Sequence, residues 1–183
     1  MNVNQISHRS TQRKQRSTRM ADWPARLHQF LDTRQHTPFA WGYNDCCLFA
    51  AAAIEALTGR HPAPALIGAY HSALGARRAS LFHRRAQREQ RNSDPAYALL
   101  PLRPPVIPLS SADPFGVLDW PRRAGLRPIP LGLAGRGDLV AIDATGARHF
   151  PALAICAGAV ALAPGRRGLE RIPRPAWLRA WRV

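Results

Sequence analysis

The segment from Phe39 to Gly59 constrains the fold more than any other part of this 183-residue chain. Asp45 is a typical helix N-cap residue, because its side chain can accept hydrogen bonds from the free N–H groups of a first turn. Small and apolar residues then recur at helical spacing as far as Gly59, a typical C-terminal stop. The alanine run from Ala50 to Ala53 allows another backbone to approach closely. We therefore predict a central, tightly packed helix that begins after Asp45.

Cys46 occupies the first turn of this predicted helix. The helix dipole and the free N–H groups there stabilise negative charge, which favours the thiolate and raises its nucleophilicity. The alternative is that Cys46 is a small buried apolar residue, a common role for free cysteines. Cys47 points about 100° away around the helix, and we assign it to the core. Cys46 is therefore a candidate nucleophile, although its position alone leaves both roles open.

The composition indicates one folded domain. A length of 183 residues supports a single core, and 46% hydrophobic residues exclude a disordered protein, while 17 prolines indicate long irregular segments. The formal net charge of +15 is compatible with an anionic partner such as nucleic acid. However, Lys14 is the only lysine among 26 basic residues, which is typical of a GC-rich genome. Charge is therefore a weak functional argument, and we rank nucleic-acid binding last.

Cysteine use and hydropathy bear on the compartment. Three cysteines, two of them adjacent, make no disulfide framework, which favours a reducing compartment. No apolar run reaches the roughly 18 residues of a membrane span, and the N-terminus has no hydrophobic signal core. We expect a soluble protein that is cytoplasmic on synthesis and is not secreted by a signal peptide. We assign it no metal and no cofactor.

The N-terminal segment, residues 1–19, is polar and basic and has no acidic residue. Such a segment cannot bury itself, and we predict a disordered arm. In an alternative interpretation, translation starts at Met20 and the arm is not made. Residues 20–183 then form a single domain with a basic, proline-rich insertion near residues 83–112. Residues 77–91 carry many arginines, which predicts a solvated basic face.

The C-terminal third of the chain predicts strands joined by short turns, and short connections make neighbouring strands antiparallel. The predicted strands are residues 138–143, 150–157, 160–163, 169–172 and 181–183, with a helical turn near 175–178. A helix capped by Asp22 precedes the central one. Helices first and sheet last predicts an α+β fold.

Three motifs in this order carry a family resemblance: Trp41-Gly42-x-x-Asp45-Cys46, then Thr58-Gly59, then Arg136-Gly-Asp-Leu-Val140 before the strands. This order resembles the NlpC/P60 cysteine peptidases over roughly residues 22–183, with an interruption near 83–112. It is most similar to a branch often encoded in prophages beside tail genes. Members of that branch carry an Asp-Cys-Cys helix start and end in Ala-Trp-Arg-Val, as residues 180–183 do here. The resemblance implies a papain-like core, with the cysteine helix packed on an antiparallel sheet.

The resemblance also implies where a catalytic site would lie. The family histidine opens the second strand of the sheet and aligns with Ala152 here. His149 is the only nearby substitute, and residues three apart on a regular strand face opposite sides. The orienting residue would fall in 160–163, which has no polar side chain. Trp41, Tyr43 and Asp45 are candidates to line a substrate groove, and the two aromatic residues fit a core equally well.

Two functions of different classes follow from the resemblance. In the first, the domain is a structural or adaptor part of a phage or prophage tail-type assembly with a degenerate active site, and it can enter a virion or tail-like particle. In the second, Cys46 and His149 form an active amidase or endopeptidase that cuts peptidoglycan peptides. The missing histidine and orienting residue favour the first. Its partners would be other tail or assembly proteins.

Overall fold

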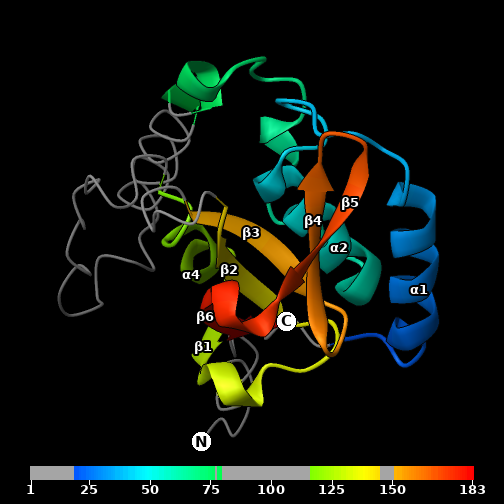
Figure 1. Cartoon of the computed structure of the whole chain (residues 1–183). Helices are drawn as coiled ribbons and strands as arrows, with labels where there is room; N and C mark the ends of the chain where they lie inside the picture. Colours follow the sequence, from blue (N-terminus) through cyan, green and yellow to red (C-terminus); the bar gives the residue numbers. More distant parts are fainter. Residues whose placement is uncertain (1–18, 77, 80–115, 145–150) are drawn as a thin grey trace, which may run out of the picture.

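The long helices α1 and α2 precede a six-stranded antiparallel sheet in the computed structural model, which describes residues 19–76, 78–79, 116–144 and 151–183 (Figure 1). The strand order is β1-β6-β2-β3-β4-β5, and all neighbouring strands run antiparallel. The α-helices and strands are α1 (Trp23–Arg34), α2 (Cys46–Thr58), α4 (Trp120–Arg123), β1 (Arg127–Ile129), β2 (Leu139–Asp143), β3 (Pro151–Cys156), β4 (Val160–Gly165), β5 (Gly168–Pro173) and β6 (Trp177–Arg182). The single-turn 3-10 helices are η1 (Pro64–Leu66), η3 (Leu131–Leu133) and η4 (Arg174–Ala176). The predicted α+β class with a C-terminal antiparallel sheet is confirmed.

The predicted strands match β2 to β5 closely, whereas β1 and β6 differ from the prediction. β1 was not predicted, because three residues give no alternation that a sequence pattern can reveal. It forms by pairing with β6, where Pro128 lies opposite Trp181. β6 begins at Trp177, well before the predicted start, because the helical turn η4 already ends at Ala176. Both differences lie at the same edge of the sheet.

Helix α2 forms as predicted and lies at the centre of the domain. Its N-cap Asp45 accepts hydrogen bonds from the backbone N–H groups of Cys47 and Leu48, and its C-cap Gly59 has a left-handed conformation. The buried residues of α2 surround much of the helix and are Leu48, Phe49, Ala50, Ala51, Ala53, Ile54 and Leu57. Helix α2 therefore packs between α1 and the sheet (Figure 1), and the rings of Phe30 and Phe49 are 5.2 Å apart.

The centre of the sheet is buried on both faces, and alternate residues of β2 and β3 belong to different cores. The face toward α2 carries Leu139 and Ala141 of β2 and Leu153 and Ile155 of β3. The other face carries a second core of small and aromatic residues, which consists of Ala134, Val140, Ile142, Ala154, Cys156, Ala161, Ala163, Trp177 and Ala180. Burial on both faces fixes the register, because a one-residue slip would exchange the two cores.

Arg19 joins the start of the described chain to its end. Its guanidinium donates hydrogen bonds to the buried carboxylate of Asp138, to the backbone oxygen of Val183 and to that of Arg136. It also lies 4.5 Å from the centre of the Trp23 ring. The predicted boundary of the arm is therefore wrong at residue 19, because Arg19 belongs to the folded domain. The rest of the arm, residues 1–18, lies outside the described residues.

Several other expectations meet the structure only in part. The proline-rich insertion near residues 83–112 lies outside the described residues, as does most of the arginine-rich stretch 77–91. Asp22 stands at the N-cap of α1, but its carboxylate pairs with Arg26 instead of capping the helix as predicted. Within the described ranges, no helix has the length and apolar character needed to cross a membrane.

Replacing Arg19 by alanine tests the importance of its contacts for the fold. Arg19→Ala leaves the Asp138 carboxylate buried, with the Gly135 N–H at 3.0 Å and the half-exposed Arg182 at 3.6 Å as its remaining partners. We expect the free energy of unfolding to fall by about 2–3 kcal/mol. Urea denaturation at neutral pH measures this change.

Arg26→Ala is the matched control, because Arg26 is partly exposed and its partner Asp22 is exposed. Exposed pairs contribute less than about 1 kcal/mol. Equal effects of the two substitutions would contradict the role assigned to Arg19.

Candidate functional site

Cys46 begins α2 and is half-buried against β3. The pKa of its thiol lies below the ordinary value, chiefly because the Cys47 side chain forms a hydrogen bond with it. The backbone N–H groups of Leu153 and Cys47 lower the pKa further, while burial and the negative charge of Asp45 act in the opposite direction. The contact with Leu153 brings the first turn of α2 against β3. The structure therefore supports the expected position of a nucleophile at a helix start.

Asp45 is fully engaged in the structure and does not line a groove. Its side chain is buried, and one carboxylate oxygen accepts the two N–H groups that cap α2. The other oxygen accepts the Gly42 N–H at 3.0 Å and the Tyr70 hydroxyl at 2.6 Å. The hypothesis that Asp45 lines a substrate groove is wrong, because all of these contacts lie inside the protein.

Tyr70 is a buried partner of Asp45 that the sequence did not reveal. Its hydroxyl reaches Asp45 across 25 positions of sequence, and no local pattern marks such a contact. Burial raises the pKa of Tyr70 well above its ordinary value, and the charge of Asp45 and the hydrogen bond raise it further. The backbone oxygen of Tyr70 also lies only 1.9 Å from where a side-chain carbon on Gly42 would stand. Glycine at position 42 is thus required by this close approach and by its φ of 76°.

The two aromatic groove candidates differ in their surroundings. Trp41 is half-buried, packs against the cluster that contains Leu48 and Tyr70, and meets Phe39 edge-on with 4.9 Å between the ring centres. Its role in the structure is therefore packing. Tyr43 is 59% exposed and stacks on His71, with 5.8 Å between the ring centres. Of the three groove candidates, Tyr43 is the one whose ring a ligand could reach.

The residues of β3 that face α2 and Cys46 are not the ones that the resemblance implies. Leu153 and Ile155 face α2, whereas Ala152 packs with the core on the far side of the sheet. The assignment of Ala152 to the position facing the cysteine is therefore wrong, because successive residues of a strand point to opposite faces. His149, the proposed substitute, lies outside the described residues.

Around the candidate nucleophile, the described residues do not supply the other groups of a hydrolytic centre. The groups that act most strongly on the Cys46 thiol are Cys47, Asp45 and Leu153, and none of them is an imidazole. β4, where the resemblance places the orienting residue, has the sequence Val-Ala-Leu-Ala-Pro-Gly and no polar side chain. Among the described residues, no group of three histidine, cysteine or acidic side chains could hold a metal ion.

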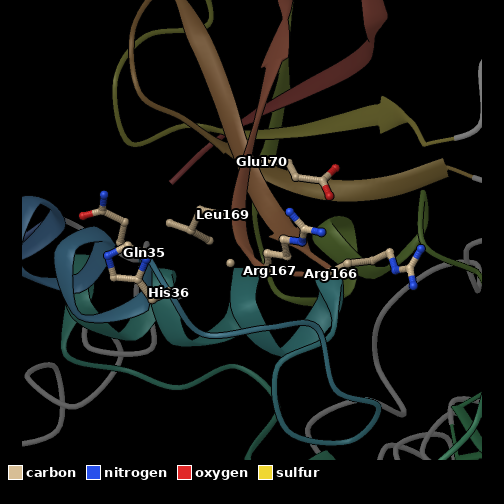
Figure 2. A pocket seen from close by; sticks show the side chains of 7 residues that line it. Gln35, His36, Arg166, Arg167, Leu169 and Glu170 are labelled. Carbon is tan, nitrogen blue, oxygen red and sulfur yellow. The ribbon is translucent and has the colours of Figure 1, made fainter.

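Two surface hollows lie away from Cys46. The larger has a volume of about 790 Å³ and lies between the loop after α1 and the turn joining β4 to β5 (Figure 2). The smaller, of about 450 Å³, lies beside β1 and β6. The residues lining the two hollows include neither Cys46 nor its neighbours Trp41, Tyr43 and Asp45. The cysteine site and the larger hollow are therefore separate features.

The lowered pKa of Cys46 predicts selective alkylation. At pH 7, iodoacetamide should modify Cys46 about ten-fold faster than Cys156 or more, because burial raises the pKa of Cys156 and one pKa unit changes the thiolate fraction ten-fold. Peptide mapping by mass spectrometry measures both rates. Cys47→Ala should slow the modification of Cys46, since it removes the largest cause of the lowered pKa. Equal rates at Cys46 and Cys156 would contradict this reading of the site.

The bond between Tyr70 and Asp45 predicts a stability change with a defined pH dependence. Tyr70→Phe should lower the free energy of unfolding by about 1–2 kcal/mol at pH 7. Because the folded-state pKa of Tyr70 is raised, its contribution is complete below the unfolded-chain pKa of about 10 and is lost as the pH rises above it. The difference between the two proteins in urea denaturation should therefore shrink above about pH 10.

Tyr43→Phe is the control for this experiment, since the Tyr43 ring is largely exposed. Its effect should stay within about 0.5 kcal/mol at each pH. A difference between wild type and Tyr70→Phe that does not change with pH would rule out the proposed coupling.

Comparison with known proteins assigns the chain to a family. A family model described as a domain of unknown function, DUF6950, matches residues 18–92 and 115–183, more than half of the chain. The match begins beside Arg19, and the unmatched residues 93–114 overlap the predicted insertion. No curated protein and no solved structure shows significant similarity. The chain therefore belongs to the DUF6950 family.

Proposed function

We propose that the domain has an NlpC/P60-like, papain-like architecture and serves as a structural or adaptor component of a phage or prophage tail-type assembly. In this proposal its catalytic centre is degenerate. The observation that carries the proposal is the apolar character of the two strands that should complete the centre. β3 and β4 present alanine, leucine, isoleucine, valine, proline and glycine, and the one other residue, Cys156, packs in the far core.

The missing groups matter because of the chemistry of amide hydrolysis. A thiolate can attack a carbonyl, but an acid must then donate a proton to the leaving amine. In the described structure, the strand face that meets α2 offers Leu153 and Ile155 for this role. Neither side chain can carry a proton. A lowered thiol pKa alone therefore does not make a peptidase.

The assembly context of the proposal comes from the family resemblance, and the structure assigns a physical role to its terminal motif. Trp181 and Val183 of the Ala-Trp-Arg-Val end are both buried, and Trp181 contributes to the core beneath α2. The Val183 backbone oxygen accepts the Arg19 hydrogen bond. The motif thus completes the hydrophobic core. This packing role is sufficient to explain the motif in a domain that has no catalytic activity.

One observation favours a second candidate function, an active cysteine amidase or endopeptidase acting on peptidoglycan peptides. This is the lowered pKa of Cys46 at the start of α2. Such an enzyme needs an imidazole at the thiol, and His149 is the residue proposed for that role. The second candidate therefore depends on two named side chains, which makes it open to direct test.

The two candidates predict different results for the same variants. We expect purified protein to release no peptide from peptidoglycan fragments above the level of Cys46→Ala, as measured by mass spectrometry. In a producing host, Cys46→Ser should leave particle assembly intact, whereas deletion of the domain should abolish it. Serine keeps the small side chain but not the thiolate.

The opposite results would overturn the proposal. Hydrolysis that is lost in both Cys46→Ala and His149→Ala would establish the peptidase. Assembly that survives deletion of the domain would exclude the structural role.

A further inference from the structure

The larger hollow has walls fixed by the backbone of two separate segments. The Leu169 N–H donates to the Gln35 backbone oxygen at 3.0 Å, and the Phe39 N–H donates to the Gly165 oxygen at 2.8 Å. Gly168 packs so closely that a side-chain carbon there would lie 2.1 Å from the Gln35 oxygen. The turn between β4 and β5 is therefore clamped onto the loop after α1. The hollow is formed in advance of any ligand.

The lining of the hollow combines cations, hydrogen-bond donors and a small apolar floor. Figure 2 shows Gln35 and His36 on one side of Leu169, with Arg166, Arg167 and Glu170 on the other. Leu169 is half-buried and packs against the core beneath it, which keeps the floor in place. A volume of about 790 Å³ lies within the range of roughly 300–1,000 Å³ typical of small-molecule sites.

No acidic side chain among the described residues pairs with the two arginines of this hollow. Arg166 and Arg167 are adjacent and exposed, and within the described part of the chain neither forms a hydrogen bond or an ion pair. Glu170 shares the hollow without pairing with either of them. Two guanidinium groups and one carboxylate leave an excess of positive charge. Guanidinium groups bind carboxylate and phosphate oxygens through paired hydrogen bonds.

We propose that this hollow is a binding site for a small organic anion, with its phosphate or carboxylate group held by Arg166 and Arg167. The rest of the ligand lies on Leu169 and receives hydrogen bonds from Gln35 and His36. Glu170 opposes the ligand's charge and limits its affinity. The proposal does not depend on Cys46 or on the proposed function, because it uses a separate part of the surface.

Titration of the full chain with two simple probes tests the site. Phenyl phosphate and benzoate carry the two kinds of anionic group on the same ring, and benzyl alcohol is the neutral probe. Amide chemical shifts of Gly168 and Leu169 report binding in two-dimensional NMR spectra. We expect saturable shifts in the millimolar range with at least one anion and none with the alcohol. The anion that binds more tightly identifies the kind of group the site takes.

Charge variants connect the shifts to the named residues. Arg166→Ala with Arg167→Ala should weaken binding about ten-fold or more, while Glu170→Gln should strengthen it about two- to five-fold. The control is Arg127→Ala with Arg171→Ala, which removes the same charge from exposed positions outside the hollow. Its binding should match that of wild type.

Three results would overturn the proposal. They are no shift with either anion at about 20 mM, which is roughly twenty times a dissociation constant of 1 mM, equal losses in the two double variants, or no gain in Glu170→Gln. Because all the substituted side chains are exposed, the variants should fold, and thermal unfolding of each variant checks this. Failure here would leave the test of Cys46 untouched.

Discussion

Asp45 places a buried carboxylate where three segments meet: the turn at Gly42, the first turn of α2 and the segment that carries Tyr70. Each contact satisfies a polar group that would otherwise be buried without a partner, and such groups cost about 1–3 kcal/mol each. The position of Cys46 follows from this arrangement, because the residue after the cap must lie on the first turn. Whatever the thiol does, its place is determined by a neighbour that cannot itself reach a substrate.

A second buried aspartate, Asp138, has a similar arrangement of contacts at the start of a central strand. Asp138 directly precedes β2, as Asp45 directly precedes α2, and it accepts a nearby backbone N–H from Gly135. Each aspartate also has side-chain partners that are distant in sequence: Asp45 accepts a hydrogen bond from Tyr70, and Asp138 pairs with Arg19 and, at 3.6 Å, with Arg182. The two central elements of the domain thus begin at buried acids whose remaining partners come from far along the chain. Loss of Tyr70 or Arg19 would leave a buried carboxylate with fewer partners, which is more costly than loss of an exposed pair.

Local patterns predicted the central helix, its cap and most of the sheet, because those features depend on residues close in sequence. What the sequence could not reveal depends on long-range pairing. β1 exists only through its partner β6, and the contacts of Tyr70 with Asp45 and of Arg19 with Asp138 span 25 and 119 positions of sequence. The predicted orientation of Ala152 in β3 was also wrong. Its neighbours in the strand are all apolar, and both faces of the strand are buried. An all-apolar strand carries no alternation to show which residues face the helix. The hollow beside the β4–β5 turn likewise combines segments that only the fold brings together.

The hydrogen bond between Arg19 and Val183 joins residues 164 positions apart and brings the two ends of the domain to one point. A force applied to residue 19 and residue 183 would therefore act directly on this hydrogen bond. The strands of the core would bear the force only after the hydrogen bond broke. Closing so long a loop adds little entropy cost beyond that of a shorter one, because the cost grows with the logarithm of length. Under the proposed assembly role, these adjacent residues would let the domain be attached at a single point, with tension bypassing the helix that bears Cys46.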